Sequence, residues 1–199
     1  MLPEGTLEIS SQKLSNHNAK KTRELNVGLI PEERILEGLW KEESCFHNMI
    51  IGLEKNFTHF EFLSNQKIEK VTALWAKNFD VRASSLEIPA QSLSGGNQQK
   101  IIFAREVDGR KPELLICHQP TRGVDIAAIQ LIYKKILNLR DKGMGILLIS
   151  SDLDELITLS DRIYIFFEGK VSAEIKQSEF DACKIGQYML GQKMEVANA

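Results

Sequence analysis

Two runs of consecutive apolar residues, separated by an amphipathic segment, constrain the fold of this chain most strongly. The runs are ELLIC at 113–117 and MGILLISS at 144–151, and each has the length of a strand. A strand that is buried on both faces has no solvent side, so its residues form a continuous apolar run. The segment between them, 126–143, has helical periodicity and ends in Lys-Gly, a helix-stop signal. This order predicts an α/β fold with a largely parallel sheet, both runs being buried strands.

The flanking segments extend this pattern. Strand-like pieces occur twice before residue 31, and the segment 152–160 has the length of a short helix. A hairpin is expected at 161–175, with its turn at Glu168-Gly169-Lys170, and a last helix is expected to follow with Ser178 as its N-cap. The second half of the chain therefore continues the alternation of strands and helices.

A helical region interrupts the α/β pattern. Apolar residues recur every three or four positions from 44 to 79, and a further helix is expected to begin just after the glycines at 95–96 and to end near Gly109. We therefore expect residues 1–40 and 106–199 to form one α/β lobe, with residues 41–105 inserted as a helical lobe.

Composition excludes several classes of function. The net charge of −2 provides no general attraction to nucleic acid or anionic lipid. No apolar run reaches the roughly 20 residues of a membrane-spanning helix, and the first ten residues do not resemble a signal peptide. The three cysteines lack metal-ligand spacing and their odd number argues against a disulfide framework, so a reducing cytosol is the expected compartment.

The stretch QSLSGGNQQK at 91–100 has the features of an anion-binding turn. Gly95 and Gly96 lack a Cβ and allow the backbone to approach a ligand closely. A helix that begins directly after them presents unpaired N–H groups and the positive end of its dipole, and the Ser94 hydroxyl adds a donor. The alternative is that Ser94 is only an N-cap preceded by a turn. Local chemistry leaves these two interpretations open.

The residues after the run at 113–117 lack the acids of a nucleotide hydrolase. Such an enzyme places an aspartate there to hold Mg²⁺ and an adjacent acid to act on water, whereas this chain has His118 and Gln119. Histidine is a poor ligand for Mg²⁺, and glutamine cannot accept a proton, although it can position a water. A transition metal at His118 would need a second ligand, which the spacing does not supply, so a structural histidine is favoured. The chain also lacks a G-x-x-x-x-G-K-[ST] phosphate loop.

Four motifs together resemble one family. LSGGNQQK at 93–100 is similar to the signature motif of the ATP-binding cassette (ABC) ATPases, and QPTRGVD at 119–125 resembles the end of their magnesium-binding strand with the following Asp-loop. GLIPEER at 28–34 resembles a stretch of the second cassette in double-cassette ATPases that drive import of monosaccharides and nucleosides, and NFDVRASS at 78–85 favours the nucleoside branch. The resemblance covers about 5–191. It implies a partial RecA-like P-loop NTPase sheet with an inserted helical lobe that carries the signature.

The chain departs from the family's pattern at the catalytic positions. His118 replaces the magnesium-binding aspartate, Gln119 replaces the catalytic glutamate, and Ser151 stands where the family has its switch histidine. Glu32 occupies the place of the Q-loop glutamine, where the alternative is a solvated loop acid, and Asp125 of the Asp-loop is present. No catalytic residue is therefore expected to be intact, and no metal site is expected in this chain.

The resemblance also concerns the phosphate loop. In the family this loop precedes the segment that 1–10 resembles, which implies that this chain begins after it, as a truncated or naturally shortened product. A sheet that lacks a central strand has unpaired backbone groups. We therefore expect a marginally stable chain that self-associates or fills the gap with its N-terminal segment.

Cassettes of the family pair head to tail, with each ATP between one partner's phosphate loop and the other's signature. The resemblance implies that ATP is shared with a partner cassette, which holds the Mg²⁺, and that this chain contributes Glu32, Asp125 and the signature residues Ser94, Gly95, Gly96, Asn97 and Gln98. It implies an ABC-type ATPase, with hydrolysis coupled to transport, that is inactive as an isolated chain.

The implied partners are a second cassette, transmembrane permease subunits and, indirectly, a periplasmic or lipoprotein solute-binding protein, with no nucleic acid. The implied location is cytoplasmic, on the inner face of the cell membrane. The alternative is an inactive docking or regulatory module that does not use ATP. A soluble ABC protein of translation or repair is a further option, against which TRGVD and IPEER argue.

Other polar and aromatic residues have competing interpretations. Trp40, Phe46 and His47 begin the helical lobe, where the family meets its permease, but core packing explains them equally well. Arg105 and Arg122 are expected to pair with carboxylates.

Residues of the helical segments have simpler roles. Gln98 and Gln99 are expected on a helix surface. Asp152, Asp154 and Glu155 are expected to complement the dipole of a helix N-terminus. Cys117 is expected to be a small buried hydrophobe.

Overall fold

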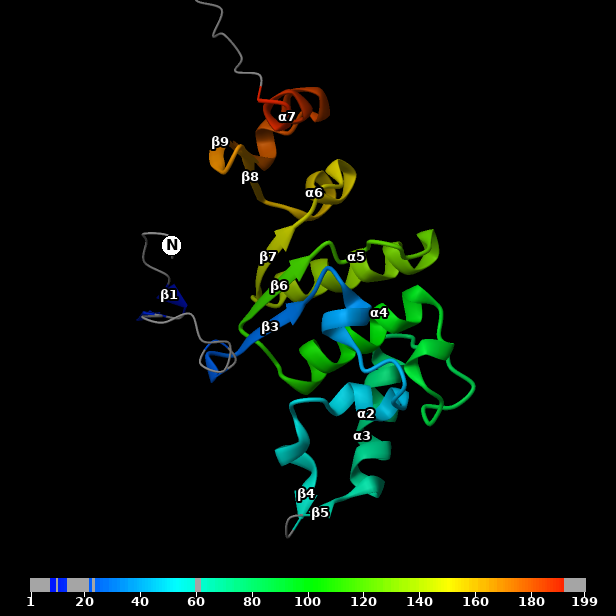
Figure 1. Cartoon of the computed structure of the whole chain (residues 1–199). Coiled ribbons are helices and arrows are strands. Elements are labelled where there is room, and N and C mark those ends of the chain that lie inside the picture. The colour runs from blue at the N-terminus through cyan, green and yellow to red at the C-terminus, as the bar shows by residue number, and fades with distance from the viewer. Residues whose placement is uncertain (1–7, 10, 14–21, 23, 60–61, 192–199) are drawn as a thin grey trace, which may run out of the picture. The chain divides into compact units, whose positions relative to one another are not determined.

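The computed structural model describes residues 8–9, 11–13, 22, 24–59 and 62–191, and the chain divides into two compact units, Met1–Leu147 and Leu148–Ala199. Figure 1 shows the order of the elements along the chain. The expectation that the N-terminal segment fills a gap in the sheet falls largely outside the described residues. The described part of this segment is a small antiparallel pair, β1 (Glu8–Ile9) and β2 (Gln12–Lys13).

The sheet of the first unit contains β3 (Val27–Ile30), β6 (Leu114–His118) and the beginning of β7 (Gly145–Ile149), in the order β3-β6-β7; the boundary between the units follows Leu147 within β7. β3 and β6 are parallel, with Val27 opposite Leu114 and Ile30 opposite Cys117. Helix α5 (Ile126–Asp141) connects β6 to β7 (Figure 1). The predicted α/β fold with a parallel pair of strands is confirmed.

Burial of the two apolar runs differs from the expectation. In β6, Leu115 and Cys117 are fully buried, and Cys117 is the small buried hydrophobe that was expected. In β7, Leu147 exposes 49% and Ile149 45% of its surface, so the prediction of a buried strand is wrong for β7. Exposed and partly buried residues alternate along β7, so the face that carries Leu147 and Ile149 is uncovered within the described residues.

The helical segment at 44–79 is not continuous. Helix α2 (Cys45–Ile50) begins at Ser44, whose Oγ accepts a hydrogen bond from the N–H of His47, and it ends before Gly52, which has a φ of 73°. Glycine in this left-handed conformation is a common helix terminator. A 3₁₀ turn (Glu54–Phe57) follows, and then the short strand pair β4 (Thr58–His59) and β5 (Phe62–Leu63). Helix α3 (Asn65–Asn78) comes next.

The core of the first unit surrounds α4 (Gly95–Phe103), in which Ile101, Ile102 and Phe103 are buried. A π-helical segment (Ala104–Gly109) continues α4 and ends at Gly109, as predicted. Short helical turns also occur at Arg34–Gly38 and Ala90–Ser92.

A buried ionic cluster follows α4. Nε of Arg105 lies 2.8 Å from Oε1 of Glu106, and Nε of Arg110 lies 2.9 Å from Oε2 of the same carboxylate. Arg105 also donates to the carbonyls of Gly38 and Asn48, and Glu106 accepts from the N–H of Leu29. The expected pairing of Arg105 with a carboxylate is confirmed, and the cluster joins the helical region to β3.

The second unit contains α6 (Leu153–Leu159), the antiparallel hairpin of β8 (Arg162–Phe167) and β9 (Lys170–Lys176), and α7 (Ala182–Met189). The hairpin turns where predicted, at Glu168 and Gly169, both of which have positive φ. Its core consists of isoleucines on β8, β9 and α7, namely Ile163, Ile165, Ile175 and Ile185.

The caps of the two helices in this unit are both aspartates. Asp152 caps α6 by accepting from the N–H of Glu155, which agrees with the expected acidic helix start. The predicted cap at Ser178 is wrong, because Ser178 lies inside a 3₁₀ turn (Gln177–Glu179) and Asp181 caps α7 instead. Asp181 has an extended backbone and its Oδ1 accepts from the N–H of Lys184 at 2.7 Å.

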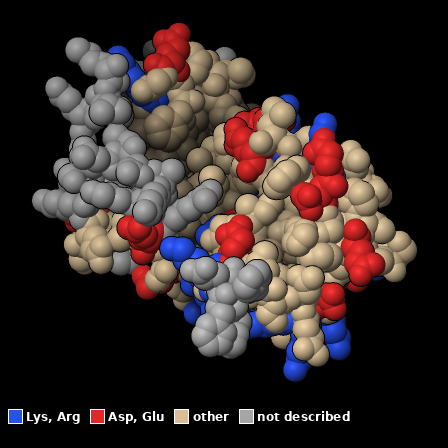
Figure 2. Space-filling view, turned by 60° about the horizontal axis from the view of Figure 1, so that its bottom comes forward, with Lys and Arg blue, Asp and Glu red and all other residues tan. Residues whose placement is uncertain are grey.

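The surface of the described residues is mixed in charge. Figure 2 shows acidic and basic side chains interspersed on the face in view. Among the described helices, none is both long and apolar enough to cross a bilayer.

Candidate functional site

The signature turn, which we define as residues 93–98, forms the start of α4. Ser94 has an extended backbone and is the N-cap, and its Oγ accepts from the N–H of Asn97 at 3.4 Å and from Nδ2 of Asn97 at 3.1 Å. Both bonds use Oγ as the acceptor, so the hydroxyl hydrogen of this exposed serine is not consumed by either. Ser94 is therefore an N-cap, as the simpler interpretation requires. Because its hydroxyl hydrogen is still available, the same hydroxyl can also donate to an anion.

The two glycines of the turn are required by packing within the chain. A Cβ on Gly95 would lie 2.6 Å from Nη2 of Arg34 and 2.8 Å from the carbonyl oxygen of Gly123. A Cβ on Gly96 would lie 2.7 Å from Oδ2 of Asp125 and 2.8 Å from Cβ of Ala128. Close approach of a ligand is thus not needed to explain these glycines. Their amide groups lie in the first helical turn, where N–H groups have no intrahelical acceptor.

The glutamines of α4 are not on its surface, contrary to the expectation. Gln98 is 7% and Gln99 2% exposed. Nε2 of Gln98 donates to the carbonyl of Ala90 at 3.1 Å, and its Oε1 accepts from Nε of Arg34 at 3.3 Å. The polar side chain is buried because both ends of its amide have partners.

A second set of contacts joins α4 to the loop at 80–82. The N–H of Arg82 donates to Oδ1 of Asn97 at 2.9 Å. The carboxylate of Asp80 lies 3.2 Å from Nζ of the buried Lys100 and 3.2 Å from Nε of Arg82. The hydrogen bonds from Lys100 and then Arg82 lower the pKa of Asp80 below its ordinary value. These contacts attach the loop at 80–82, which precedes the signature turn in the sequence, to α4.

The end of β6 forms ion pairs rather than a metal site. Nε2 of His118 lies 3.3 Å from Oε2 of Glu32. Arg122 pairs with Glu32 through Nη1 and lies 3.0 Å from Oε1 of Glu33, which confirms that Arg122 pairs with carboxylates. Gln119 follows with a φ of 49°. Glu32 is thus engaged with two basic side chains and is not a solvated loop acid.

This arrangement does not fit Mg²⁺. The ion requires oxygen ligands, and the carboxylate nearest the strand end already pairs with Arg122 and lies against His118. Within the part of the chain that the structure describes, His, Cys, Asp and Glu form no group of three that could hold a metal ion.

The remaining predicted residues lie in different places. Asp125 is the N-cap of α5, and its Oδ1 accepts from the N–H of Ala128 at 3.0 Å. Its other carboxylate oxygen, Oδ2, lies next to Gly96 of the signature turn. Ser151 belongs to the second unit, where it is exposed just before α6. The structure therefore brings together Glu32, His118, the signature turn and Asp125 within the first unit.

Arg34 is a site residue that the sequence argument missed. It donates from Nη1 to the carbonyl of Arg122 at 2.7 Å and from Nη2 to the carbonyl of Gly123 at 3.3 Å, in addition to its bond to Gln98. The partners are 64 to 89 positions away along the chain. A lone arginine after two glutamates has no local signal for such contacts, so only the folded chain reveals them.

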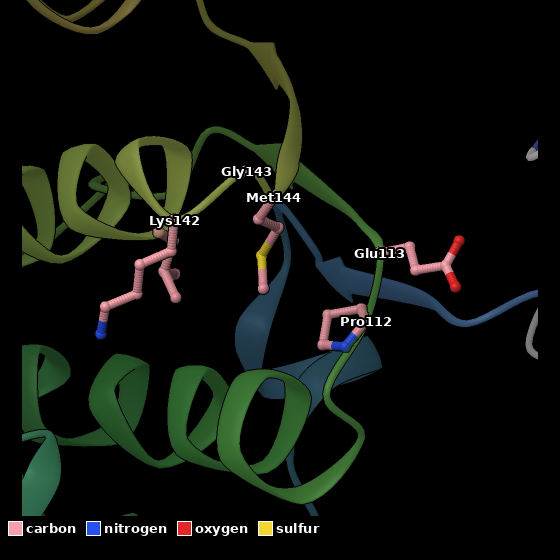
Figure 3. A pocket seen from close by; sticks show the side chains of 6 residues that line it. Pro112, Glu113, Lys142, Gly143 and Met144 are labelled. Atoms are coloured by element: carbon pink, nitrogen blue, oxygen red, sulfur yellow. The ribbon is translucent and has the colours of Figure 1, made fainter.

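A shallow pocket lies at the opposite end of β6. Its lining includes Pro112 and Met144, which face the hollow in Figure 3, whereas Glu113 points away from it. The pocket does not gather polar groups that converge on one point, so it is not the candidate site.

The chain resembles known proteins in fold and in sequence. No family model matches the chain. The fold is similar to a solved structure described as a dimeric, post-hydrolysis state of the ATP-binding cassette MJ0796 bound to ADP and Pi, with a TM-score of 0.72 and 21% identity over 89% of this chain and 75% of that one. The chain therefore has the α/β fold of an ABC ATPase cassette.

Proteins with similar sequences include ATP-binding proteins that are named for nucleoside and sugar import. The chain is 36% identical to the nucleoside import ATP-binding protein NupA of Lactococcus lactis over 94% of its length, and 35% identical to the guanosine import ATP-binding protein NupO of Bacillus subtilis over 97%. It is 37% identical to the glucose import ATP-binding protein TsgD13 of Haloferax volcanii over 94%. The chain is thus similar in sequence to ATP-binding proteins that are named for nucleoside and sugar import. It spans 37%, 38% and 34% of those three relatives.

Proposed function

We propose that this chain is the second cassette, or part of it, of a double-cassette importer for nucleosides or simple sugars. In this proposal the chain donates its signature turn to ATP that a partner cassette holds. The observation that carries the proposal is an asymmetry within the first unit. The signature turn is complete and presents an exposed Ser94, whereas at the end of β6 the carboxylate of Glu32 contacts His118 and pairs with Arg122.

The chemistry of the signature turn suits a phosphate group. α4 has nine residues, and its first amide groups and dipole favour an anion at its N-terminus. The Ser94 hydroxyl can add a further donor to these amides. ATP, when bound, would supply the terminal phosphoryl group that is transferred to water. The role of this chain's residues would be to hold that group and not to activate water.

The proposal assigns Mg²⁺, the phosphate loop and the general base to the partner. His118 and Gln119 cannot replace two acids, and loss of a general base typically costs about 10²–10⁴-fold in rate. We therefore propose that the isolated chain is inactive as an ATPase. We also propose the lobe division of 1–40 and 106–199 against 41–105, with Asp125 and Glu32 at the edge that faces the partner.

An apolar surface next to the site suits a permease subunit. Leu36 is 82% and Trp40 60% exposed, both in or just after the turn Arg34–Gly38. Phe46 and His47 pack on each other with ring centroids 4.3 Å apart, so they are less available to a partner. The relatives named for import support transmembrane permease partners, a location on the inner face of the membrane, and an indirect relation to a solute-binding protein.

The test combines this chain with an intact first cassette from a nucleoside import protein. Ser94→Arg would fill the phosphate position, and ATP affinity of the mixture is expected to fall about tenfold or more, by analogy with loss of a preorganised donor. Ser178→Arg, an exposed serine of the second unit, is the matched control and should leave the affinity unchanged. An unchanged affinity with Ser94→Arg would favour the docking module that does not use ATP. Magnesium-dependent turnover by the isolated chain would contradict the proposal directly.

A further inference from the structure

Residues 32–34 connect parts of the first unit that are distant in sequence. Glu32 pairs with His118 and Arg122, and Glu33 pairs with Arg122. Arg34 continues this set of contacts to the signature turn. Three consecutive side chains thus join the end of β6, the Asp-loop at 119–125 and the start of α4.

Arg34 is the member that contacts both functional loops. Its Nε donates to Oε1 of Gln98 in the first turn of α4, and its two terminal nitrogens donate to the carbonyls of Arg122 and Gly123 in the Asp-loop. A planar guanidinium can make these three bonds in fixed directions, which an ammonium group cannot reproduce.

The backbone around Arg34 is shaped to accept it. Arg34 is half-buried, and a Cβ on Gly95 would lie 2.6 Å from its Nη2. A Cβ on Gly123 would lie 3.4 Å from its Nη1, and Gly123 has a φ of 65°. A glycine on each side therefore leaves room for the guanidinium, one in the signature turn and one in the Asp-loop.

We propose that Arg34 is a positioning residue that holds the signature turn and the Asp-loop in a fixed mutual arrangement. It acts on the phosphate site through Gln98 and Gly95, and it does not touch the phosphate. Gln98 is anchored at its other end to Ala90, so displacement of Arg34 frees one end of a buried amide. The consequence for ATP rests on the function proposed above, whereas the effect on the two loops does not.

The first experiment measures amide hydrogen exchange in the full chain without nucleotide. Arg34→Met keeps an apolar side chain of similar length and removes all three donors, while Arg34→Lys keeps one cation. We expect exchange in 93–99 and 119–125 to become about five- to tenfold faster in Arg34→Met, with partial recovery in Arg34→Lys. Arg162→Met, which removes an exposed arginine from an ion pair with Glu174 in the second unit, is the control. Unchanged exchange in both loops of Arg34→Met would overturn the proposal.

The second experiment measures ATP affinity in the mixture with an intact first cassette. Weaker binding with Arg34→Met, recovered in part by Arg34→Lys, supports a positioning role, since a purely space-filling role would be met equally by methionine. If Ser94→Arg weakens binding and Arg34→Met does not, the positioning role fails and the proposed function stands. If neither variant changes binding, the proposed function fails, and the exchange experiment alone decides whether Arg34 orders the two loops.

Discussion

Nε2 of His118 lies 3.3 Å from Oε2 of Glu32, at the end of β6 where a nucleotide hydrolase keeps its acids. The carboxylate here belongs to Glu32, on the loop after β3, and the residue at the end of β6 is the imidazole His118. Both side chains are partly exposed, at 41% and 33%, so the pair makes only a modest contribution to stability. Its main consequence is that a new carboxylate at 118 would face an existing one.

His118→Asp is therefore expected to lower stability and not to create an ATPase. The two carboxylates would repel each other, and the free energy of unfolding should fall by about 0.5–1 kcal/mol near neutral pH. Urea denaturation and a phosphate-release assay measure the two effects. The double variant His118→Asp with Glu32→Gln should recover the stability. A single variant that is as stable as the parent, or that hydrolyses ATP with magnesium, would show that the edge is organised differently.

Asp80→Asn should change how stability depends on pH. The pKa of Asp80 is lowered from its ordinary value of 3.8, chiefly by Lys100 and then by Arg82, so the folded state favours the ionised carboxylate. Its stabilisation is fully present above pH 3.8 and is lost as the pH falls further, through the folded-state pKa. The difference in unfolding free energy between parent and variant should accordingly be largest above this value and shrink in more acidic solution.

Asparagine is a conservative replacement at this position. Asp80 has a φ of 49°, which asparagine tolerates. Urea denaturation across the acidic range provides the measurement. A difference that grows as the pH falls would have the wrong sign for this mechanism.

Gly96→Ala should destabilise the chain through overpacking. The added methyl group would meet Oδ2 of Asp125 at 2.7 Å and Cβ of Ala128 at 2.8 Å, and the short side chain of Ala128 cannot move aside. A cost of about 1–3 kcal/mol is expected. Gly186→Ala is the matched control, because a methyl group added at this position inside α7 would meet no atom within 4 Å apart from its chain neighbours and the backbone of its own helix. That variant should gain about 0.5–1 kcal/mol, and equal effects of the two substitutions in thermal denaturation would refute the packing argument.

The three thiols should react very differently with a labelling reagent. Cys45 and Cys117 are buried and Cys183 is exposed. Burial also raises the pKa of the Cys45 thiol, which lowers its thiolate fraction, and its Sγ lies 3.2 Å from the carbonyl of Ile88. We expect one rapidly labelled thiol in the native chain and three after denaturation. Cys183→Ser should abolish the fast phase, and a fast phase that survives this substitution would place a second thiol at the surface.

Much of the backbone was predictable because its signals are local. The apolar runs at 113–117 and 144–151 predicted two strands, Lys-Gly marked the end of α5 to within a residue or two, and the turn at Glu168 and Gly169 was placed correctly. Local signals do not choose between two residues that can both cap the same helix. Ser178 and Asp181 are both good caps, and the position of the intervening 3₁₀ turn selected Asp181.

The sequence by itself determined the order of strands and helices, the signature turn with its capping Ser94, and the loss of acids at His118 and Gln119, since each depends on residues a few positions apart. Only the tertiary structure decided the burial of Gln98, the exposure of β7 and the bonds of Arg34 to partners 64 to 89 positions away. The physical reason is that a cap or a turn is completed by neighbouring backbone groups. The partners of a buried amide or a guanidinium, in contrast, exist only after distant segments have packed together.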